Sequence, residues 1–558
     1  MVDFSRARNK TAILLDARSL HNFYMKRANR VCRNLSLFIL ARLLFTAIEL
    51  NAADAPKPPK LVLAIVIDQF RYDYLLRFRA DYNSGLNRLL EQGAVFTDAH
   101  YIHATTVTAV GHSTFLSGAT PSVSGIIANE WFDRASGKTV TSVSDPQTKL
   151  VGGISNREGS SPRRLITSTV TDELKMRFPD SHVIGVSIKD RSAILPAGHM
   201  ADAAYWYDDD SNHWVTSTYF RADLPDWAKR VNDEKYFQRS VGAQWMPFDA
   251  KPNGTQGDKA VPFCSMTKGT EVRFCGSIEA SPWGNEMIEQ FAEAALVGEQ
   301  LGQHATTDIL AVSFSSNDYV GHAVGPDDPA VRDISIRTDR LLGKLFDAVQ
   351  KSVGMQNTLV VLTADHGVAP VPEVNVARKM PGGRLSAPAL SQAVNDALEK
   401  RFGPGKWLMP GAVQAPYLNL ELIREYKLNP EDFEKVIAET ALQQPHIARA
   451  YTRSDLLAGT IQRDNIGNAV DVSFYAPRSP DVYIVAEPYY LFEGTGTSHG
   501  TPYDYDNHVP VIFMGASIKP GSYNAPIIVN DVAPTLAQLL GIERPSGSFG
   551  RVLDQIFK

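Results

Sequence analysis

Five short apolar runs constrain the fold of this chain more than any other feature. They cover residues 61–67, 183–188, 309–314, 359–363 and 509–514. A continuous apolar run of this length is typical of a strand that is buried on both faces. Asp68 and Lys189 directly follow the first two runs, and Asp318 and Asp365 come shortly after the third and the fourth. The chain therefore predicts buried strands with polar side chains at their carboxyl ends.

Helical patterns separate these runs, over residues 84–92, 168–178, 284–301, 329–353 and 531–541. Strands that alternate with helices predict an α/β fold with a mostly parallel central sheet and helices on both faces. Sheets of this kind bind ligands at the carboxyl ends of their strands. The polar residues that end the runs fall at that edge, so we expect the functional site there.

Two long stretches fall outside the alternation. Residues from about 200 to 282 are rich in aromatic side chains, and residues from about 370 to 495 contain helices of their own, one of them started by Asn429-Pro430. We predict two insertions that cap the carboxyl edge of the sheet. Their tryptophans fit the core of an insertion better than a ligand-binding wall. Those of the first stretch are Trp206, Trp214, Trp227 and Trp245.

Residues 1–55 have the composition of a leader segment. After Met25 come four basic residues, a mostly apolar run over 35–50, and small residues at 52, 53 and 55. That order is typical of a secretory signal peptide, and the apolar run is too short to span a bilayer comfortably. We expect Met25 to be the true start and the mature protein to be periplasmic or secreted, without stable membrane insertion. The alternative is an amphipathic tail on a cytosolic protein.

Charge and cysteine content agree with this expectation. A net charge of -5 does not favour binding to nucleic acid. Of the three cysteines, Cys32 would leave with the signal peptide, and Cys264 and Cys275 lie close together in the sequence. In an oxidising compartment such a pair suits a disulfide. Two free buried thiols are the alternative.

The stretch 104–118 begins with hydroxyl residues, Thr105, Thr106 and Thr108 among them, and continues as a short apolar helix that ends at Gly118. A hydroxyl residue at a helix start is commonly an N-cap. It also lies where free N–H groups and the positive end of the helix dipole hold an anion, so that a hydroxyl nucleophile could meet a bound phosphate. The stretch alone leaves both interpretations open.

Carboxylates and imidazoles gather around the predicted strand ends. Asp318 and His322 are four residues apart, so one helical turn places both on the same side. Asp365 and His366 are adjacent at the end of a strand. With Asp68 and His499, they form a ligand set without sulfur that suits zinc or a similar divalent ion. Each pair by itself is equally compatible with helix caps and buried core histidines.

Taken together, these motifs resemble the alkaline phosphatase superfamily, and most closely the bacterial periplasmic alkaline phosphatases that use a threonine nucleophile. The matching segments are 66–71, 106–112, 129–131, 189–191, 318–322, 364–367 and 497–500. The resemblance implies an alkaline-phosphatase-like catalytic domain over 56–558, interrupted by the two insertions at about 200–282 and 370–495.

The resemblance also implies two zinc ions roughly 4 Å apart. One would be held by Asp68, Asp365 and His366, with the Thr108 oxygen beside it. The other would be held by Asp318, His322 and His499. Thr108 would attack phosphorus and form a phosphothreonine intermediate, with its hydroxyl activated by the first ion.

Asn129, Lys189 and Arg191 decide the expected substrate class. A phosphate monoester carries more charge on its non-bridging oxygens than a diester, so a cationic pair at a strand end favours the monoester. The residues alone favour a solvated Lys-Asp-Arg turn at 189–191, but the resemblance implies a phosphate monoesterase that acts on small molecules. We also expect a monomer. The nearest alternative is a phosphodiesterase or nucleotide pyrophosphatase of the same fold. A non-catalytic protein that binds metal or phosphate is the alternative from another class.

Overall fold

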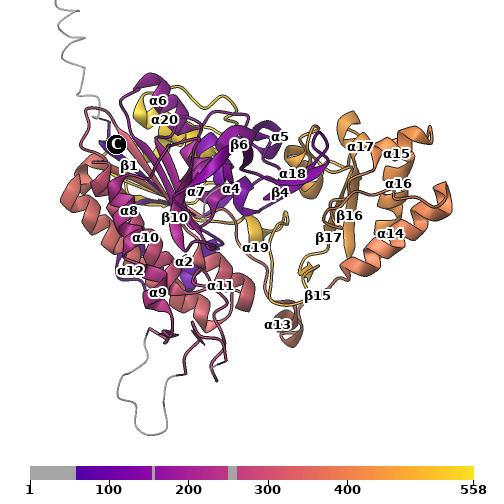
Figure 1. Ribbon diagram of the computed structural model, residues 1–558, viewed down its shortest axis with the longest axis horizontal. Helices are drawn as coiled ribbons and strands as arrows, with labels where there is room; N and C mark the ends of the chain where they lie inside the picture. Colours follow the sequence, from indigo (N-terminus) through magenta and orange to yellow (C-terminus); the bar gives the residue numbers. More distant parts are fainter. Residues whose placement is uncertain (1–57, 154–156, 249–260, 270) are drawn as a thin grey trace, which may run out of the picture. The chain divides into compact units, whose positions relative to one another are not determined.

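Five parallel strands form the centre of an 11-stranded sheet in the computed structural model (Figure 1). In spatial order they are β14 (Thr358–Thr363), β1 (Leu61–Ile67), β13 (Asp308–Phe314), β8 (Val183–Ser187) and β9 (Ala203–Asp208). Every residue of these strands is buried. The apolar runs predict this for β14, β1, β13 and β8. Their carboxyl ends meet at one edge of the sheet.

The structure describes residues 58–153, 157–248, 261–269 and 271–558. The predicted extension and signal peptide, with Met25 and Cys32, lie outside these ranges. Among the described residues, no helix combines the length and apolar character needed to cross a lipid bilayer.

Antiparallel pairs flank the parallel centre, so the prediction of a mostly parallel sheet holds for the inner five strands. On one side lie β19 (Val511–Met514), β2 (Ala94–Phe96) and β20 (Gly521–Tyr523), and on the other β10 (His213–Ser217), β6 (Ser144–Val151) and β7 (Glu158–Ser160). β20 pairs in parallel with β2, and the other flanking pairs are antiparallel. β19 runs antiparallel to β14, with Val511 beside Thr363. β19 therefore starts at the carboxyl edge of the central strands, and the segment before it ends there.

Helices cover the sheet on both faces (Figure 1). One group packs around α12 (Pro329–Ser352), and includes α3 (Gly85–Gln92), α8 (Asp226–Asp233), α10 (Pro282–Gly298) and α11 (Ser316–Val324). The other group packs around α4 (Thr108–Ser117), and includes α6 (Val170–Arg177), α7 (Asp190–Ala197) and α20 (Val532–Leu540). This arrangement confirms the predicted α/β class.

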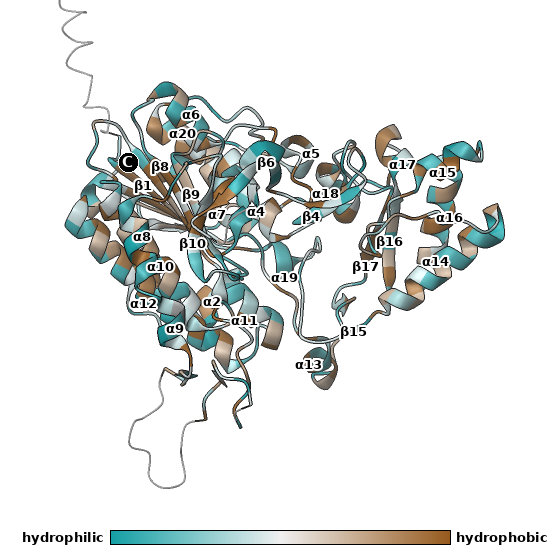
Figure 2. Ribbon diagram, viewed as in Figure 1, coloured by the Kyte–Doolittle hydropathy of each residue, from teal (hydrophilic) through white to brown (hydrophobic). Residues whose placement is uncertain are grey.

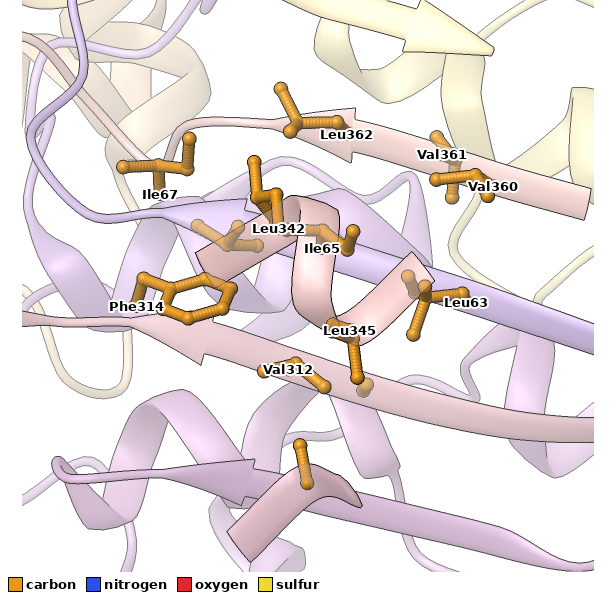
Figure 3. Packing of buried hydrophobic residues seen from close by; sticks show 14 of the residues in the cluster. Leu63, Ile65, Ile67, Val312, Phe314, Leu342, Leu345, Val360, Val361 and Leu362 are labelled. Carbon is orange, nitrogen blue, oxygen red and sulfur yellow. The ribbon is translucent and has the colours of Figure 1, made fainter. Parts of the chain in front are cut away.

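Aliphatic side chains bind the helices to the sheet. Leu342 and Leu345 of α12 lie against side chains of β1 and β13, among them Ile65 and Val312 (Figure 3). All four are buried. Figure 2 shows the same pattern at the scale of the fold, with hydrophobic central strands and helices of mixed hydropathy around them.

The structure differs from the prediction at residues 203–217, which form β9 and β10 of the central sheet and not part of an insertion. The aromatic side chains of these strands are buried because they continue the sheet. Trp214 stacks on Phe291 of α10 at 4.2 Å between ring centroids. Trp206, Trp227 and Trp245 are also buried, as core tryptophans are. Cys264 and Cys275 form a disulfide.

Residues between β14 and β19 build a separate hydrophobic core from Leu390, Trp407, Phe433 and their neighbours. The helices and strands of this stretch are α13 (Pro372–Ala377), β15 (Gly383–Arg384), α14 (Ala387–Phe402), α15 (Leu420–Glu425), α16 (Pro430–Leu442), β16 (Ile447–Thr452), α17 (Arg453–Ala458), α18 (Asn465–Ser473), β17 (Val482–Ala486) and β18 (Tyr490–Leu491). As predicted, Asn429 caps α16, and its side chain accepts a hydrogen bond from the Glu431 N–H.

The remaining short elements connect these parts. They are α2 (Tyr72–Arg77), β3 (Ala99–His100), α5 (Pro121–Ser124), β4 (Glu130–Asp133), β5 (Lys138–Thr141), α9 (Tyr236–Ser240), β11 (Gln244–Trp245), β12 (Cys264–Ser265), α19 (Asp504–Asn507) and β21 (Ile527–Ile528). Short 3-10 turns lie at Pro162–Arg164, Met355–Asn357, Val529–Asp531 and Asp554–Ile556.

Candidate metal-binding active site

Thr108 is the first residue of α4, and its side chain is almost fully buried. The helix ends at Gly118, which has a φ of 64° and so adopts the left-handed conformation that glycine allows. Its N-terminus points to the carboxyl edge of the sheet, where Lys189 Nζ lies 3.5 Å from Thr108 Oγ1. The predicted nucleophile therefore lies at a helix N-terminus beside a buried cation, an arrangement that suits an anion.

Three aspartates from the strand ends converge near Thr108. Asp68 follows β1, Asp365 follows β14, and Asp318 lies in the first turn of α11 after β13. All three are buried. Lys189 Nζ joins two of them, at 2.7 Å from Asp68 Oδ2 and 2.6 Å from Asp318 Oδ2. Parallel strand order thus brings carboxylates distant in sequence into one cluster.

Each of the three predicted histidine ligands is oriented in the same way. A backbone carbonyl lies next to Nδ1, namely Thr497 O for His322, Gly367 O for His366 and Thr106 O for His499, at 2.8 to 2.9 Å. Such a contact fixes the Nδ1–H tautomer and leaves Nε2 with a lone pair for a metal ion. The Nε2 atoms face the carboxylates, with His322 Nε2 3.2 Å from Asp318 Oδ1.

Several potential metal-ligand atoms in this cluster lack a hydrogen-bond partner among the described residues. Asp68 Oδ1, Asp365 Oδ2 and His366 Nε2 are buried and make no hydrogen bond to the described residues, although Asp365 Oδ2 lies 3.2 Å from His112 Nδ1. Buried polar atoms almost always have a hydrogen-bond partner, so a group of buried oxygen and nitrogen atoms without one fits the binding of a metal ion. Asp68, Asp365 and His366 offer ligand atoms within 4.8 Å of one another, and so do Asp318, His366 and His499.

The second predicted ligand set is also brought together. His499 Nε2 lies 3.2 Å from His322 Nε2 and 3.6 Å from Asp318 Oδ1. Two imidazole nitrogens that each carry a lone pair approach this closely only with a cation between them or with one of them protonated. The donor set therefore fits divalent metal ions bound by nitrogen and oxygen.

The electrostatic environment favours the metal-binding forms of Asp318 and His499 and opposes that of Asp68. Burial would raise the pKa of Asp318, but Lys189 and His322 outweigh it and hold this pKa well below the usual range. Burial and the nearby Asp365 raise the pKa of Asp68. Burial, with His366 and His322, lowers the pKa of His499. The low pKa of the imidazole and of Asp318 favours deprotonated ligands, as metal binding requires.

The three residues expected to contact phosphate lie on or beside α4 and α7, two helices that pack against each other. Asn129 Oδ1 accepts a hydrogen bond from the Ala109 N–H at 2.8 Å, which leaves its amide NH₂ free to donate to another group. Lys189 is the N-cap residue of α7, and Arg191 lies in its first turn. Arg191 Nε is buried without a hydrogen-bond partner. The Arg191 Nε and the Asn129 amide group, which have no hydrogen-bond acceptor among the described residues, are suited to an anionic ligand.

Two neighbours of the ligands were not predicted as site residues. His112 lies one helical turn after Thr108, and its Nδ1 is 2.8 Å from Thr108 O and 3.2 Å from Asp365 Oδ2. Gln69 donates from its backbone N–H to Asp365 Oδ1 and from Nε2 to Asp318 Oδ1. For His112, the i, i+4 spacing from Thr108 was the available signal.

A third group with ligand spacing, Asp98, His100 and His508, lies outside this cluster. Three of its four ring nitrogens have hydrogen-bond partners: His100 contacts Asp98 and Asn507, and His508 Nε2 contacts Thr97 O. This group therefore lacks the orphaned buried atoms that mark the main cluster.

Comparison with known families identifies the fold. The family model described as type I phosphodiesterase / nucleotide pyrophosphatase matches residues 62–508. The chain belongs to this family. The match covers most of the chain and includes the segments with Asp68, Thr108, Asp318, Asp365 and His499. The predicted membership of the alkaline phosphatase superfamily is confirmed.

Individual relatives match nearly their whole length. Alkaline phosphatase PhoV of Synechococcus elongatus is 38% identical over 518 residues, which cover 90% of this chain and 93% of PhoV. Alkaline phosphatase PafA of Elizabethkingia meningoseptica is 34% identical over 518 residues, which cover 89% of this chain and 94% of PafA.

The structure of PafA also matches. The crystal structure of wild-type PafA gives a TM-score of 0.83 at 32% identity and covers 90% of this chain and 100% of PafA. A second PafA structure, in which a threonine is replaced by serine and an asparagine, a lysine and an arginine by alanine, gives a TM-score of 0.82. These matches confirm the predicted fold class.

Proposed function

We propose that this protein is a zinc-dependent alkaline phosphatase in which Thr108 is the nucleophile. The observation that carries this mechanism is the convergence on Thr108: Lys189 Nζ lies 3.5 Å from its hydroxyl and contacts the carboxylates of both ligand groups. The activity itself follows from PhoV and PafA, which are named alkaline phosphatases and match most of the chain. The prediction of a phosphate monoester hydrolase is thereby confirmed.

Asp68, Asp365 and His366 would hold one ion, and Asp318, His322 and His499 the other. When bound, such ions act as Lewis acids that lower the pKa of a neighbouring hydroxyl and stabilise a departing oxygen. Zinc is the ion we propose, because imidazole nitrogen together with carboxylate oxygen suits it.

Thr108 Oγ1 forms a bond to phosphorus as the bond from phosphorus to the alcohol oxygen breaks. The resulting phosphothreonine is then cleaved by water, which returns the hydroxyl and releases phosphate. The position of Thr108 at the start of α4 supports this role, because the positive end of a helix favours the charge that the phosphoryl group carries.

Asn129, Lys189 and Arg191 would bind the non-bridging oxygens. The substituted positions in the PafA mutant support this assignment, since its threonine and asparagine are 21 positions apart, as Thr108 and Asn129 are. Its lysine and arginine are two positions apart, as Lys189 and Arg191 are. A lysine and an arginine together match the two charges of a monoester better than the single charge of a diester.

We further propose export to the periplasm or the medium, directed by the signal peptide within residues 1–55. The disulfide between Cys264 and Cys275 supports an oxidising compartment. We propose that the protein acts as a monomer on small phosphomonoesters.

Phosphodiesterase activity is the second candidate, because the family description names it. Hydrolysis of an aryl phosphate monoester and of the matching diester, measured with and without zinc, separates the two. We expect a zinc-dependent preference for the monoester. In the double variant Lys189→Ala, Arg191→Ala, monoester kcat/KM should fall about 10³-fold, with a much smaller change for the diester.

Arg230→Ala is the matched control, since Arg230 is an exposed cation on α8, away from the cluster. A wild-type preference for the diester would assign the phosphodiesterase function. An equal loss of both activities in the double variant would refute the assigned role of Lys189 and Arg191.

A further inference from the structure

A pocket of about 320 Å³ opens directly beside the cluster. Asn129 and His499 lie in its lining, next to Ser498 and Gly500. Because Asn129 is bonded to the start of α4 and His499 belongs to the ligand cluster, one end of the pocket adjoins the position of the phosphoryl group. A group attached to that phosphorus could therefore extend into the pocket.

The walls of this pocket come from two parts of the chain. The loop before α4 supplies Ala104, Thr105 and Val107. The segment from Tyr483 to Glu493, which includes β17 and β18, supplies most of the opposite wall. The larger apolar and aromatic side chains in the lining are Val107, Val470, Tyr483, Ile484, Val485, Tyr490, Leu491 and Phe492. Such walls suit an apolar or aromatic group.

Charge in the lining is of one sign. Among the described residues that line the pocket, Glu130 and Glu493 carry carboxylates, and no lysine or arginine is present. Both glutamates are exposed and lie at the surface end. The cations Lys189 and Arg191 belong to the phosphoryl end of the site and do not line this pocket. A second anionic group on the substrate would meet repulsion here.

We propose that this pocket binds the alcohol part of the phosphomonoester and selects uncharged aromatic or apolar alcohols over those that carry a further anionic group. The inference rests on the proposed function and adds the class of substrate. Phe492 and Tyr490 form the contact surface for the alcohol, and Glu493 with Glu130 excludes anions such as a second phosphate or a carboxylate.

Benzyl phosphate and methyl phosphate test the apolar part, because both release simple primary alcohols and differ mainly in the phenyl ring. We expect the wild-type enzyme to show a kcat/KM about tenfold higher for benzyl phosphate. In Phe492→Ala this ratio should fall towards one. Tyr426→Ala is the matched control, since Tyr426 is an exposed aromatic residue of the same insertion outside the pocket, and it should keep the wild-type ratio.

Phosphoglycolate, which carries a carboxylate, tests the charge. We expect the ratio of kcat/KM for phosphoglycolate to that for methyl phosphate to rise about two- to fivefold in Glu493→Lys. Glu425→Lys, an exposed site outside the pocket, should leave the ratio as in the wild-type enzyme. Because Glu493 is exposed, this variant tests the pocket even where loss of Phe492 impairs folding.

The role of the pocket and the phosphatase activity can fail separately in these experiments. Suppose that the enzyme hydrolyses methyl phosphate with zinc, but the ratio of kcat/KM for benzyl phosphate to that for methyl phosphate is the same in the wild type and in Phe492→Ala. This result would refute the proposed role of the pocket and keep the proposed function. An enzyme that hydrolyses none of the three monoesters would refute the proposed function itself.

Discussion

At the scale of a single residue, His112 contacts Asp365, one of the proposed metal ligands. It is fully buried, and its Nδ1 lies 3.2 Å from Asp365 Oδ2 while Nε2 contacts Ser313 Oγ. Loss of such a supporting contact typically weakens metal affinity about 10- to 100-fold. We predict this loss for His112→Phe, measured by competition with a chelator, with activity recovered at excess zinc. An unchanged zinc affinity would show that His112 does not support Asp365.

His103 should make the free energy of unfolding depend on pH. Neither ring nitrogen has a partner among the described residues, and burial lowers the pKa of His103 from 6.5 to about 3. Between these values the unfolded chain binds a proton that the folded chain does not. The free energy of unfolding should therefore decrease as the pH falls from about 6.5 towards about 3, by up to about 1.4 kcal/mol per pH unit.

His103→Phe removes this contribution and keeps an aromatic ring beside Tyr101. Urea unfolding of the metal-free proteins at about pH 7 and about pH 5 should show a pH-dependent loss that is about 2 kcal/mol larger in the wild type than in the variant. The same loss in both proteins would mean that His103 is not the group responsible.

At the scale of the element, α4 depends on close contact with the loop after β14. A Cβ on Gly111 would lie 2.2 Å from Asp365 O and 2.6 Å from its Cα. Gly111→Ala should therefore move Thr108 away from the ligands, with a loss of about 10²-fold in kcat/KM. Overpacking should also lower stability by about 1–3 kcal/mol. Gly494→Ala, where a Cβ meets nothing within 4 Å, is the control. Full activity in Gly111→Ala would contradict this packing.

Much of the fold and the site could be predicted at this scale. The apolar runs predict β1, β8, β13 and β14, and a candidate site residue follows each of them, because parallel strands share a carboxyl edge. The spacing of Asp318 and His322 predicted one side of a helix, and both lie on α11. Local pattern is sufficient where a strand or one helical turn sets the position of a side chain.

Other features depend on contacts that a linear pattern does not contain. The antiparallel direction of β19 follows from its pairing with β14. The sequence predicts an insertion where β9 and β10 lie, because their aromatic residues do not form a continuous aliphatic run. His112 and Gln69 reach the aspartates only after α4 and the strand ends come together. The direction of strands and the residues that support the ligands therefore required the structure.

At the scale of the whole molecule, the metal cluster links stability to bound ions. The buried carboxylates of Asp68, Asp318 and Asp365 outnumber the one buried lysine among them, Lys189. Removal of the ions leaves this charge uncompensated, so chelation should lower the melting temperature measured by calorimetry. Zinc at about 100 times its Kd should restore about 2.7 kcal/mol for each site that it fills. A melting temperature that does not respond to chelator or zinc would contradict the metal centre.

The central claim is that the phosphoryl group passes through Thr108, and the stereochemical course at phosphorus tests it most directly. Transfer from a monoester with a chiral, isotopically labelled phosphoryl group to an acceptor alcohol would be followed by NMR. Each in-line displacement inverts phosphorus, so attack by Thr108 followed by attack of the acceptor predicts net retention, with transfer abolished in Thr108→Ala. Net inversion, or transfer at the wild-type rate in Thr108→Ala, would contradict the account.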